Sequence, residues 1–147
     1  MNSKPLGKVA VIAAVAAILQ GCVTTYVPQP DEPMVTVRTV GFGRPQLCKD
    51  GKYYFAPPAK GIDNAVSIPA ASRVTVGAHL VSDGYQVVHY CRPFLSFEPK
   101  LGQMYFMNSA LSGDGRCGVE LVREDRASKT GLAVEPSVAQ PVCSAAK

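Results

Sequence analysis

Three Asp-Gly dipeptides, each lying between runs of β-branched and aromatic residues, place the strongest constraint on the fold of this chain. They are Asp50-Gly51, Asp83-Gly84 and Asp114-Gly115. Asp-Gly favours the tight turns that join antiparallel strands, because both residues tolerate a positive φ. The sequence therefore predicts three β-hairpins, and it favours turn positions over catalytic carboxylates for these aspartates.

Short runs of strand-forming residues surround these turns, and Gly and Pro residues interrupt them. The expected strands and hairpins cover residues 34–40, 48–55, 65–68, 73–91, 94–97, 103–111 and 116–123. No convincing helix follows residue 22, and the tail from about residue 125 is poor in large apolar side chains. This pattern predicts an all-β fold, a small antiparallel β-sandwich or barrel.

The expected hairpin over 73–91 has two candidate registers. If Asp83-Gly84 is a two-residue turn, Leu80 faces Val87 on the return strand. A three-residue loop that includes Ser82 would shift the return strand by one residue and turn its side chains over. The first register is preferred because it buries more apolar side chains on one face.

The start of the chain has the pattern of an export signal. Lys4 and Lys8 precede the run from Val9 to Leu19, which has no polar side chain. A positive start and a short apolar run are typical of a secretory signal, and a membrane span would need about 20 apolar residues. Because the run has no polar face, an amphipathic helix is disfavoured. Residues 1–21 are predicted to be a helical signal peptide.

Leu19-Gln20-Gly21-Cys22 resembles the lipobox of bacterial lipoprotein precursors. The resemblance implies that cleavage makes Cys22 the first mature residue and that Cys22 carries diacylglycerol and a further acyl chain such as palmitate. Several acyl chains anchor a protein stably, so membrane lipid is the expected partner of Cys22. Since Val23 rather than Asp follows, the resemblance implies the outer membrane, with the domain facing the periplasm.

Residues 22–33 are expected to form a spacer between the lipid and the domain. Pro28, Pro30 and Pro33 fix φ and lack a backbone donor. At about 3.1 Å per residue, an extended spacer would hold the domain some 30 Å from the lipid. A disordered leader is the alternative, and the β-rich domain is expected over residues 34–147.

The composition without the signal narrows the classes of partner. Removing residues 1–21 from the 147 leaves 126 residues, the size of one small domain. These contain 13 basic and 11 acidic residues, so the net charge is about +2. There is no run of Lys and Arg and no basic helix, and nucleic-acid binding is therefore not supported.

Four cysteines follow the signal: Cys48, Cys91, Cys117 and Cys143. An even set in an exported domain favours two disulfides over a metal site, and three pairings are possible. The hypothesis chosen pairs Cys91 with Cys117, which end and begin neighbouring strands, and would stabilise the fold by roughly 3.5 kcal/mol. Cys48 would then clamp the tail through Cys143.

The segment from Cys91 to Tyr105 carries a second resemblance. Its pattern, Cys-x-Pro-x-x-Ser-Phe-x-Pro-x-x-Gly-x-x-Tyr, is similar to that of small, functionally uncharacterised proteobacterial lipoproteins with a second Cys on the next hairpin. The resemblance implies a β-rich domain and supports the pairing of Cys91 with Cys117. It implies no activity.

No catalytic constellation is recognisable. The sequence lacks a Gly-x-Ser-x-Gly elbow, a His-Glu-x-x-His motif and a glycine-rich phosphate loop. The preferred register puts the only histidines, His79 and His89, on opposite faces of their hairpin, where they do not share a metal. The charged residues from Glu120 to Arg126 are interpreted as a solvated strand end. We expect no cofactor, no metal and no enzyme activity.

Tyr53 and Tyr54 are the candidate partner contacts. They lie with Phe55 on an expected strand, so at least one of the three rings points away from the core. Aromatic side chains are enriched at interfaces. Packing of the rings against Ala56-Pro57-Pro58 is the alternative.

The sequence thus predicts a membrane-anchored envelope lipoprotein that acts as a non-catalytic binding or structural module. An envelope protein or glycan is the candidate partner. The alternative is an inhibitor of a lysozyme or protease that inserts the loop over residues 111–116 into an active site. An enzyme is the least favoured class.

Overall fold

The computed structural model describes residues 23–41, 43–84, 87–112 and 114–144, and within these ranges it contains ten strands and no helix. The strands are β1 (Met34–Gly41), β2 (Arg44–Lys49), β3 (Lys52–Phe55), β4 (Ala65–Pro69), β5 (Val74–Gly84), β6 (Val87–Cys91), β7 (Phe94–Phe97), β8 (Tyr105–Leu111), β9 (Cys117–Glu124) and β10 (Leu132–Val134). The all-β prediction is confirmed. The predicted signal peptide and Cys22 lie outside the described residues.

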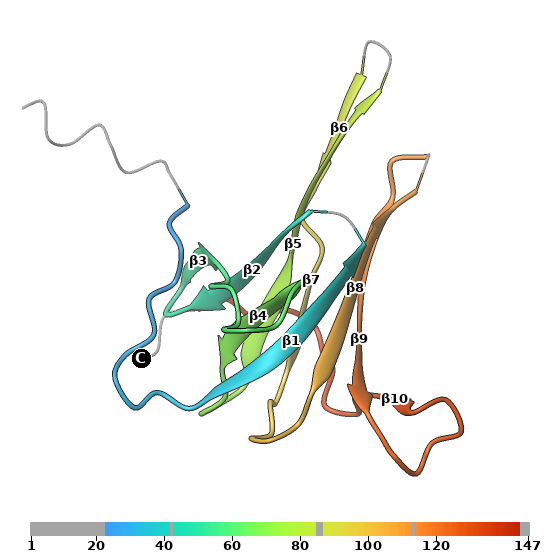
Figure 1. Cartoon of the computed structure of the whole chain (residues 1–147). Coiled ribbons are helices and arrows are strands. Elements are labelled where there is room, and N and C mark those ends of the chain that lie inside the picture. The colour runs from blue at the N-terminus through green and yellow to red at the C-terminus, as the bar shows by residue number, and fades with distance from the viewer. Residues whose placement is uncertain (1–22, 42, 85–86, 113, 145–147) are drawn as a thin grey trace, which may run out of the picture.

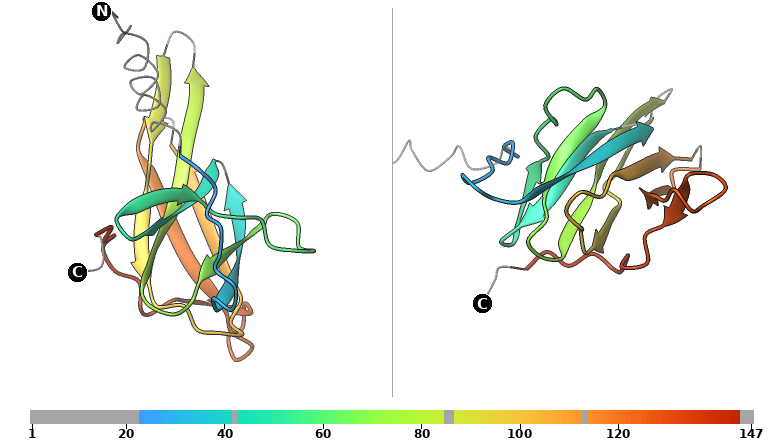
Figure 2. Two further views of the ribbon diagram at one scale, coloured as in Figure 1. Left: turned by 90° about the vertical axis from the view of Figure 1, so that its left-hand side faces the viewer. Right: turned by 60° about the horizontal axis from the view of Figure 1, so that its bottom comes forward.

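The strands form the two layers of a sandwich (Figures 1 and 2). The first sheet has the order β10-β9-β8-β1-β4, and the second has the order β3-β2-β5-β6, with β7 also paired to β5. Neighbouring strands are antiparallel except β1 and β8, which are parallel, with Val37 opposite Tyr105. The mainly antiparallel sandwich agrees with the prediction, whereas the parallel pair depends on a crossover that no local pattern announces.

The core lies between the two sheets. Phe97 of the second sheet and Tyr105 of the first are fully buried, and their ring centroids lie 5.0 Å apart in an edge-on arrangement. Leu47, Ile68 and Val37 are buried around them. Each such side chain contributes about 1.5–3 kcal/mol by leaving water, so this layer fixes which face of every strand points inward.

The longest hairpin pairs in a register that differs from both predicted alternatives. Leu80 lies opposite Cys91 rather than Val87, and Asp83-Gly84 continue β5 instead of forming the turn. β5 has eleven residues, and it pairs first with β7 and then with β6 in one continuous register. The predicted turn was wrong because β6 and β7 pair with β5 in one register. In that register Gly84 lies opposite Val87 and is still part of the strand.

The two other Asp-Gly hairpins are confirmed. Lys49 pairs with Lys52, and Asp50 and Gly51 both have positive φ, 52° and 76°, as the tight hairpin turn requires. The third hairpin joins β8 to β9, with Leu111 opposite Cys117.

Residues 23–33, part of the segment predicted to be an extended spacer, pack on the domain. Thr25 forms a parallel bridge with Phe55 at the edge of the second sheet. Tyr26 is buried, its ring meets Tyr54 edge-on at 5.6 Å, and its hydroxyl donates a 2.6 Å hydrogen bond to Glu32. Glu32 also forms a 3.4 Å ion pair with Lys49, and Pro33 accepts a 2.8 Å hydrogen bond from the backbone of Ala70. These contacts fix the segment, and its prolines leave few conformations to lose.

Both hypothesised disulfides are present, Cys48–Cys143 and Cys91–Cys117. The tail that Cys143 fixes also pairs with the edge of β7 in the second sheet. Ala139 and Ser96 exchange two backbone hydrogen bonds of 3.0 and 2.8 Å. The tail is therefore fixed by backbone pairing as well as by the disulfide, and it runs along the lower edge of the sandwich (Figure 2).

Candidate functional site

The outer side of the second sheet, beyond the part that the tail covers, carries a cluster of aromatic and basic side chains. Paired positions place them in rows across the strands: Phe55, Gln46, Gly77 and Phe94 form one row, and Arg44 and His79 belong to the next. Arg92 continues the second row, because β6 and β7 share one register on β5. We call this surface the aromatic–arginine face; its members are Arg44, Gln46, Tyr53, Phe55, His79, Tyr90, Arg92 and Phe94.

Two rings from distant strands close over the middle of this face. The ring centroids of Tyr53 and Phe94 lie 4.8 Å apart, although β2 and β5 separate β3 from β7. Gly77 makes room for Phe94, since a Cβ at this position would lie 2.5 Å from the Phe94 ring. As a result Gln46 is only 1% exposed on an outward-facing strand position.

Two arginines lie against the rings without an acidic partner. The Arg44 guanidinium carbon is 3.7 Å from the centroid of Phe55, and that of Arg92 is 5.3 Å from the centroid of Tyr53. Arg92 also donates a 3.0 Å hydrogen bond to Oε1 of Gln46. The ion pairs among the described residues involve other cations, Lys49, Arg73 and Arg116. Two positive charges are therefore gathered on one face with no carboxylate to neutralise them.

Two buried nitrogens on the same face have no hydrogen-bond partner among the described residues: Nε2 of Gln46 and Nε2 of His79. The His79 ring meets Tyr90 edge-on at 5.0 Å, so its position is fixed by packing. An unpaired buried polar atom costs about 1–3 kcal/mol, and native proteins contain few of them. The arrangement can bind an oxygen-rich ligand through the exposed guanidinium groups of Arg44 and Arg92, which donate to oxygen.

The structure separates the two tyrosines that the sequence marked as candidate contacts. Tyr53 is 36% exposed and lies on the aromatic–arginine face, whereas Tyr54 points to the inner side and packs on Tyr26. The two histidines lie on opposite faces of their hairpin, as expected, since His89 pairs with Ser82 and His79 occupies the alternate position. Only Tyr53 and His79 therefore belong to the candidate site.

Other types of site find no support in the described part of the chain. Within 23–41, 43–84, 87–112 and 114–144, no three His, Cys, Asp or Glu side chains are grouped to bind a metal ion. None of these residues belongs to a helix with the length and apolar character needed to cross a membrane. The charged strand end from Glu120 to Arg126 forms no ion pair among these residues, which agrees with a solvated surface.

Sequence reasoning missed Arg44, Gln46, Arg92 and Phe94. A signal was present: Arg44 and Gln46, like Arg92 and Phe94, are spaced by two residues and so share one face of an extended segment. This spacing indicates a shared site only when the two segments are known to lie in one sheet and in this register. No protein-family model, curated protein or solved structure matches the chain.

Proposed function

We propose that this protein is a lipid-anchored module of the bacterial envelope that binds a partner through the aromatic–arginine face and catalyses no reaction. The observation that carries the proposal is the pair of guanidinium groups, Arg44 and Arg92, that rest on aromatic rings without an acidic partner among the described residues. Tyr and Arg are the residue types that contribute most to binding at interfaces.

The proposed anchor is Cys22, on the strength of the lipobox-like sequence before it. Because Thr24 and Tyr26 both hydrogen-bond to the backbone of Phe55, such an anchor would keep the domain close to the bilayer. The proposed location is the outer membrane, with the domain on the periplasmic side.

Mass spectrometry of the protein recovered from membranes tests the anchor. We expect a mature N-terminus at an acylated Cys22 and both disulfides formed. The matched control is Cys22→Ser, which should remain uncut and leave no acyl adduct. An unmodified Cys22 in the wild-type protein would contradict the anchor.

Site-specific photo-crosslinking in cells tests the face. A photoreactive residue in place of Tyr53 should give an adduct that is lost in the Arg44→Gln/Arg92→Gln background. The control position is Leu132, on β10 of the other sheet, which is 38% exposed against 36% for Tyr53. Equal labelling from both positions would contradict a binding role for this face.

A second candidate function, inhibition of a lysozyme or protease, is favoured by the loop between β8 and β9. Ser112 donates a 2.6 Å hydrogen bond to Asp114, and Asp114 forms a 2.6 Å ion pair with Arg116. The Cys91–Cys117 disulfide fixes the end of this loop. A preorganised loop loses little entropy on entering an active site. Inhibition of a hydrolase that is abolished by Arg116→Ala would support this function over the first.

A further inference from the structure

We infer that the aromatic–arginine face binds the phosphate headgroups of the membrane that anchors the chain, so that the second sheet lies against the bilayer. This inference rests on the proposed acylation of Cys22, and it names the ligand of the proposed binding face. Three features of the described residues lead to it: the position of the first described residues, the uncompensated charge and the exposed apolar hairpin.

The start of the described chain, at Val23 and Thr24, lies beside the face. Phe55 donates a 2.9 Å backbone hydrogen bond to Thr24, and its ring supports the Arg44 guanidinium at 3.7 Å. Consecutive Cα atoms are about 3.8 Å apart, so the Cα of Cys22 is within about 8 Å of that of Thr24. An acyl chain on Cys22 would therefore bring the bilayer surface next to β3, at the edge of the second sheet.

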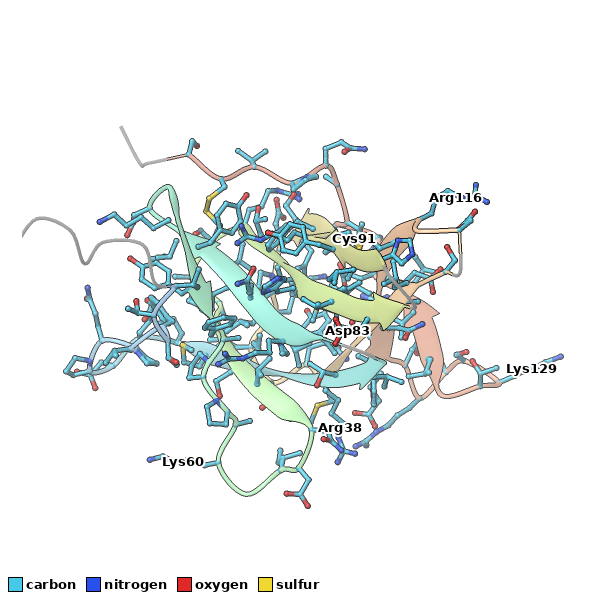
Figure 3. All side chains as sticks on the ribbon, turned by 90° about the horizontal axis from the view of Figure 1, so that it is seen from above. Arg38, Lys60, Asp83, Cys91, Arg116 and Lys129 are labelled. Carbon is cyan, nitrogen blue, oxygen red and sulfur yellow. A yellow bond between two sulfur atoms is a disulfide. The ribbon has the colours of Figure 1, made fainter. Side chains whose placement is uncertain are left out.

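The charge of the face complements a headgroup layer. Arg44 and Arg92 have no acidic partner among the described residues, and an arginine guanidinium binds phosphate oxygens through two parallel hydrogen bonds. Anionic lipids attract each nearby Arg by about 1 kcal/mol. The loop residues Lys60, Arg116 and Lys129 extend away from the body of the domain (Figure 3), whereas Arg44 and Arg92 lie against aromatic rings of the sheet.

The β5–β6 hairpin extends the same face with apolar side chains. Val81, Val88 and Tyr90 occupy its outward positions and are 54%, 64% and 60% exposed. Valine gains by leaving water, and Tyr prefers the headgroup level of a bilayer. Asp83, the acidic member of these positions, lies opposite Val88 at the end of the hairpin distant from the arginines.

The hairpin and the start of the described chain lie toward the same end of the sandwich (Figure 1). Figure 1 shows β5 and β6 projecting beyond the sandwich at the end where the described chain begins. In the proposed orientation, the β3 edge, the arginines and the hairpin would contact the bilayer together. The first sheet, with β10 at its edge, would face away from the membrane.

A single tryptophan tests this orientation, because the chain contains none. The full-length lipoprotein carrying Tyr53→Trp is reconstituted into vesicles of zwitterionic and anionic phospholipid that include brominated lipid, which quenches nearby Trp fluorescence. We expect strong quenching at position 53 and little at position 132 in the Leu132→Trp control. The Arg44→Gln/Arg92→Gln substitutions should at least halve the quenching at position 53, and added salt should weaken it.

The outcomes separate this inference from the proposed anchor. Protein that fails to float with the vesicles and lacks an acyl mass would contradict the anchor. Protein that floats but shows equal, weak quenching at positions 53 and 132 would overturn the membrane-facing orientation alone. Titration of the Tyr53→Trp variant with inorganic phosphate or an acidic oligosaccharide is the third arm. A change in the fluorescence of this variant with the oligosaccharide, and none with vesicles, would overturn the lipid in favour of a glycan.

Discussion

The rings of Tyr53 and Phe94 lie 4.8 Å apart although two strands run between the strands that carry them. The contact is possible because the two residues between Phe94 and β3 in its row leave space above them: Gly77 has no side chain, and Gln46 lies buried under the rings. It makes part of the outer side of the second sheet a second packed layer, in which Arg92 hydrogen-bonds to Gln46.

This contact should appear as a coupling energy between Tyr53 and Phe94. In a double-mutant cycle with Tyr53→Leu and Phe94→Leu, we expect a coupling of about 0.5–1.5 kcal/mol in the free energy of unfolding, measured with urea. The control cycle combines Tyr53→Leu with Val134→Ala on the other sheet, and its effects should add. Additivity in both cycles would show that the ring pair contributes nothing.

Gly77 should tolerate no side chain. A Cβ there would clash with the carbonyl oxygen of Pro93 and lie 2.5 Å from the Phe94 ring. We expect Gly77→Ala to lower the free energy of unfolding by about 1–3 kcal/mol, because two strands must shift. Gly118 on β9 is the matched control, since a Cβ there meets nothing within 4 Å. Gly118→Ala should be neutral or stabilise by a few tenths of a kcal/mol.

The bonds of Glu32 should make stability depend on acid pH. Burial raises the pKa of Glu32, but hydrogen bonds from Tyr26, Gln29 and Lys49 outweigh burial and lower the pKa below its ordinary value of 4.5. A carboxyl with a lowered folded-state pKa contributes stability above its unfolded-state pKa and loses it as the pH falls through the folded-state value.

We therefore expect the free energy of unfolding to fall as the pH is lowered from about 5, and to fall less in Glu32→Gln. At pH 7 the variant should be less stable by about 1 kcal/mol. Tyr26→Phe is the control that removes one of the three hydrogen bonds and keeps the carboxylate. Identical pH profiles for wild type and Glu32→Gln would contradict this account.

The parts of the fold that the sequence predicts are those determined by neighbouring residues. The turn at Asp50-Gly51 follows from residues that accept positive φ, and alternating side chains locate β7 and β8. The register of β5 with β6 was wrong because Asp83-Gly84 has the same local preference for a turn, and only the pairing of β7 with β5 makes the strand continue. Pairing between distant segments decides whether an Asp-Gly dipeptide forms a turn or continues a strand, and such pairing leaves no local signal.

The candidate site was predictable only in part for the same reason. Tyr53 could be identified because three consecutive aromatic residues cannot all point inward. Arg44 and Arg92 are 48 positions apart, and each alone has the pattern of an ordinary solvated residue. Their common place on the outer side of the second sheet depends on the order β2-β5-β7, which becomes known only with the structure.

The tail is attached both by the Cys48–Cys143 disulfide and by backbone hydrogen bonds, and this allows a last prediction. The loop-entropy relation assigns about 4.7 kcal/mol to the Cys48–Cys143 bond, whose sequence separation is 95. We expect Cys48→Ser/Cys143→Ser to lose a large part of that free energy of unfolding, while the tail stays attached through Ala139 and Ser96. Amide hydrogen exchange separates the two contributions.

In Cys48→Ser/Cys143→Ser the amide of Ala139 should remain protected, since it donates a 2.8 Å hydrogen bond to Ser96, whereas the amide of Val142 should exchange faster. Val142 depends on a single hydroxyl acceptor, Oγ1 of Thr75, at 3.0 Å next to the removed disulfide. The control is Thr75→Val with the disulfide intact, which should expose Val142 alone. Equal loss of protection at Ala139 and Val142 would mean that the disulfide alone fixes the tail.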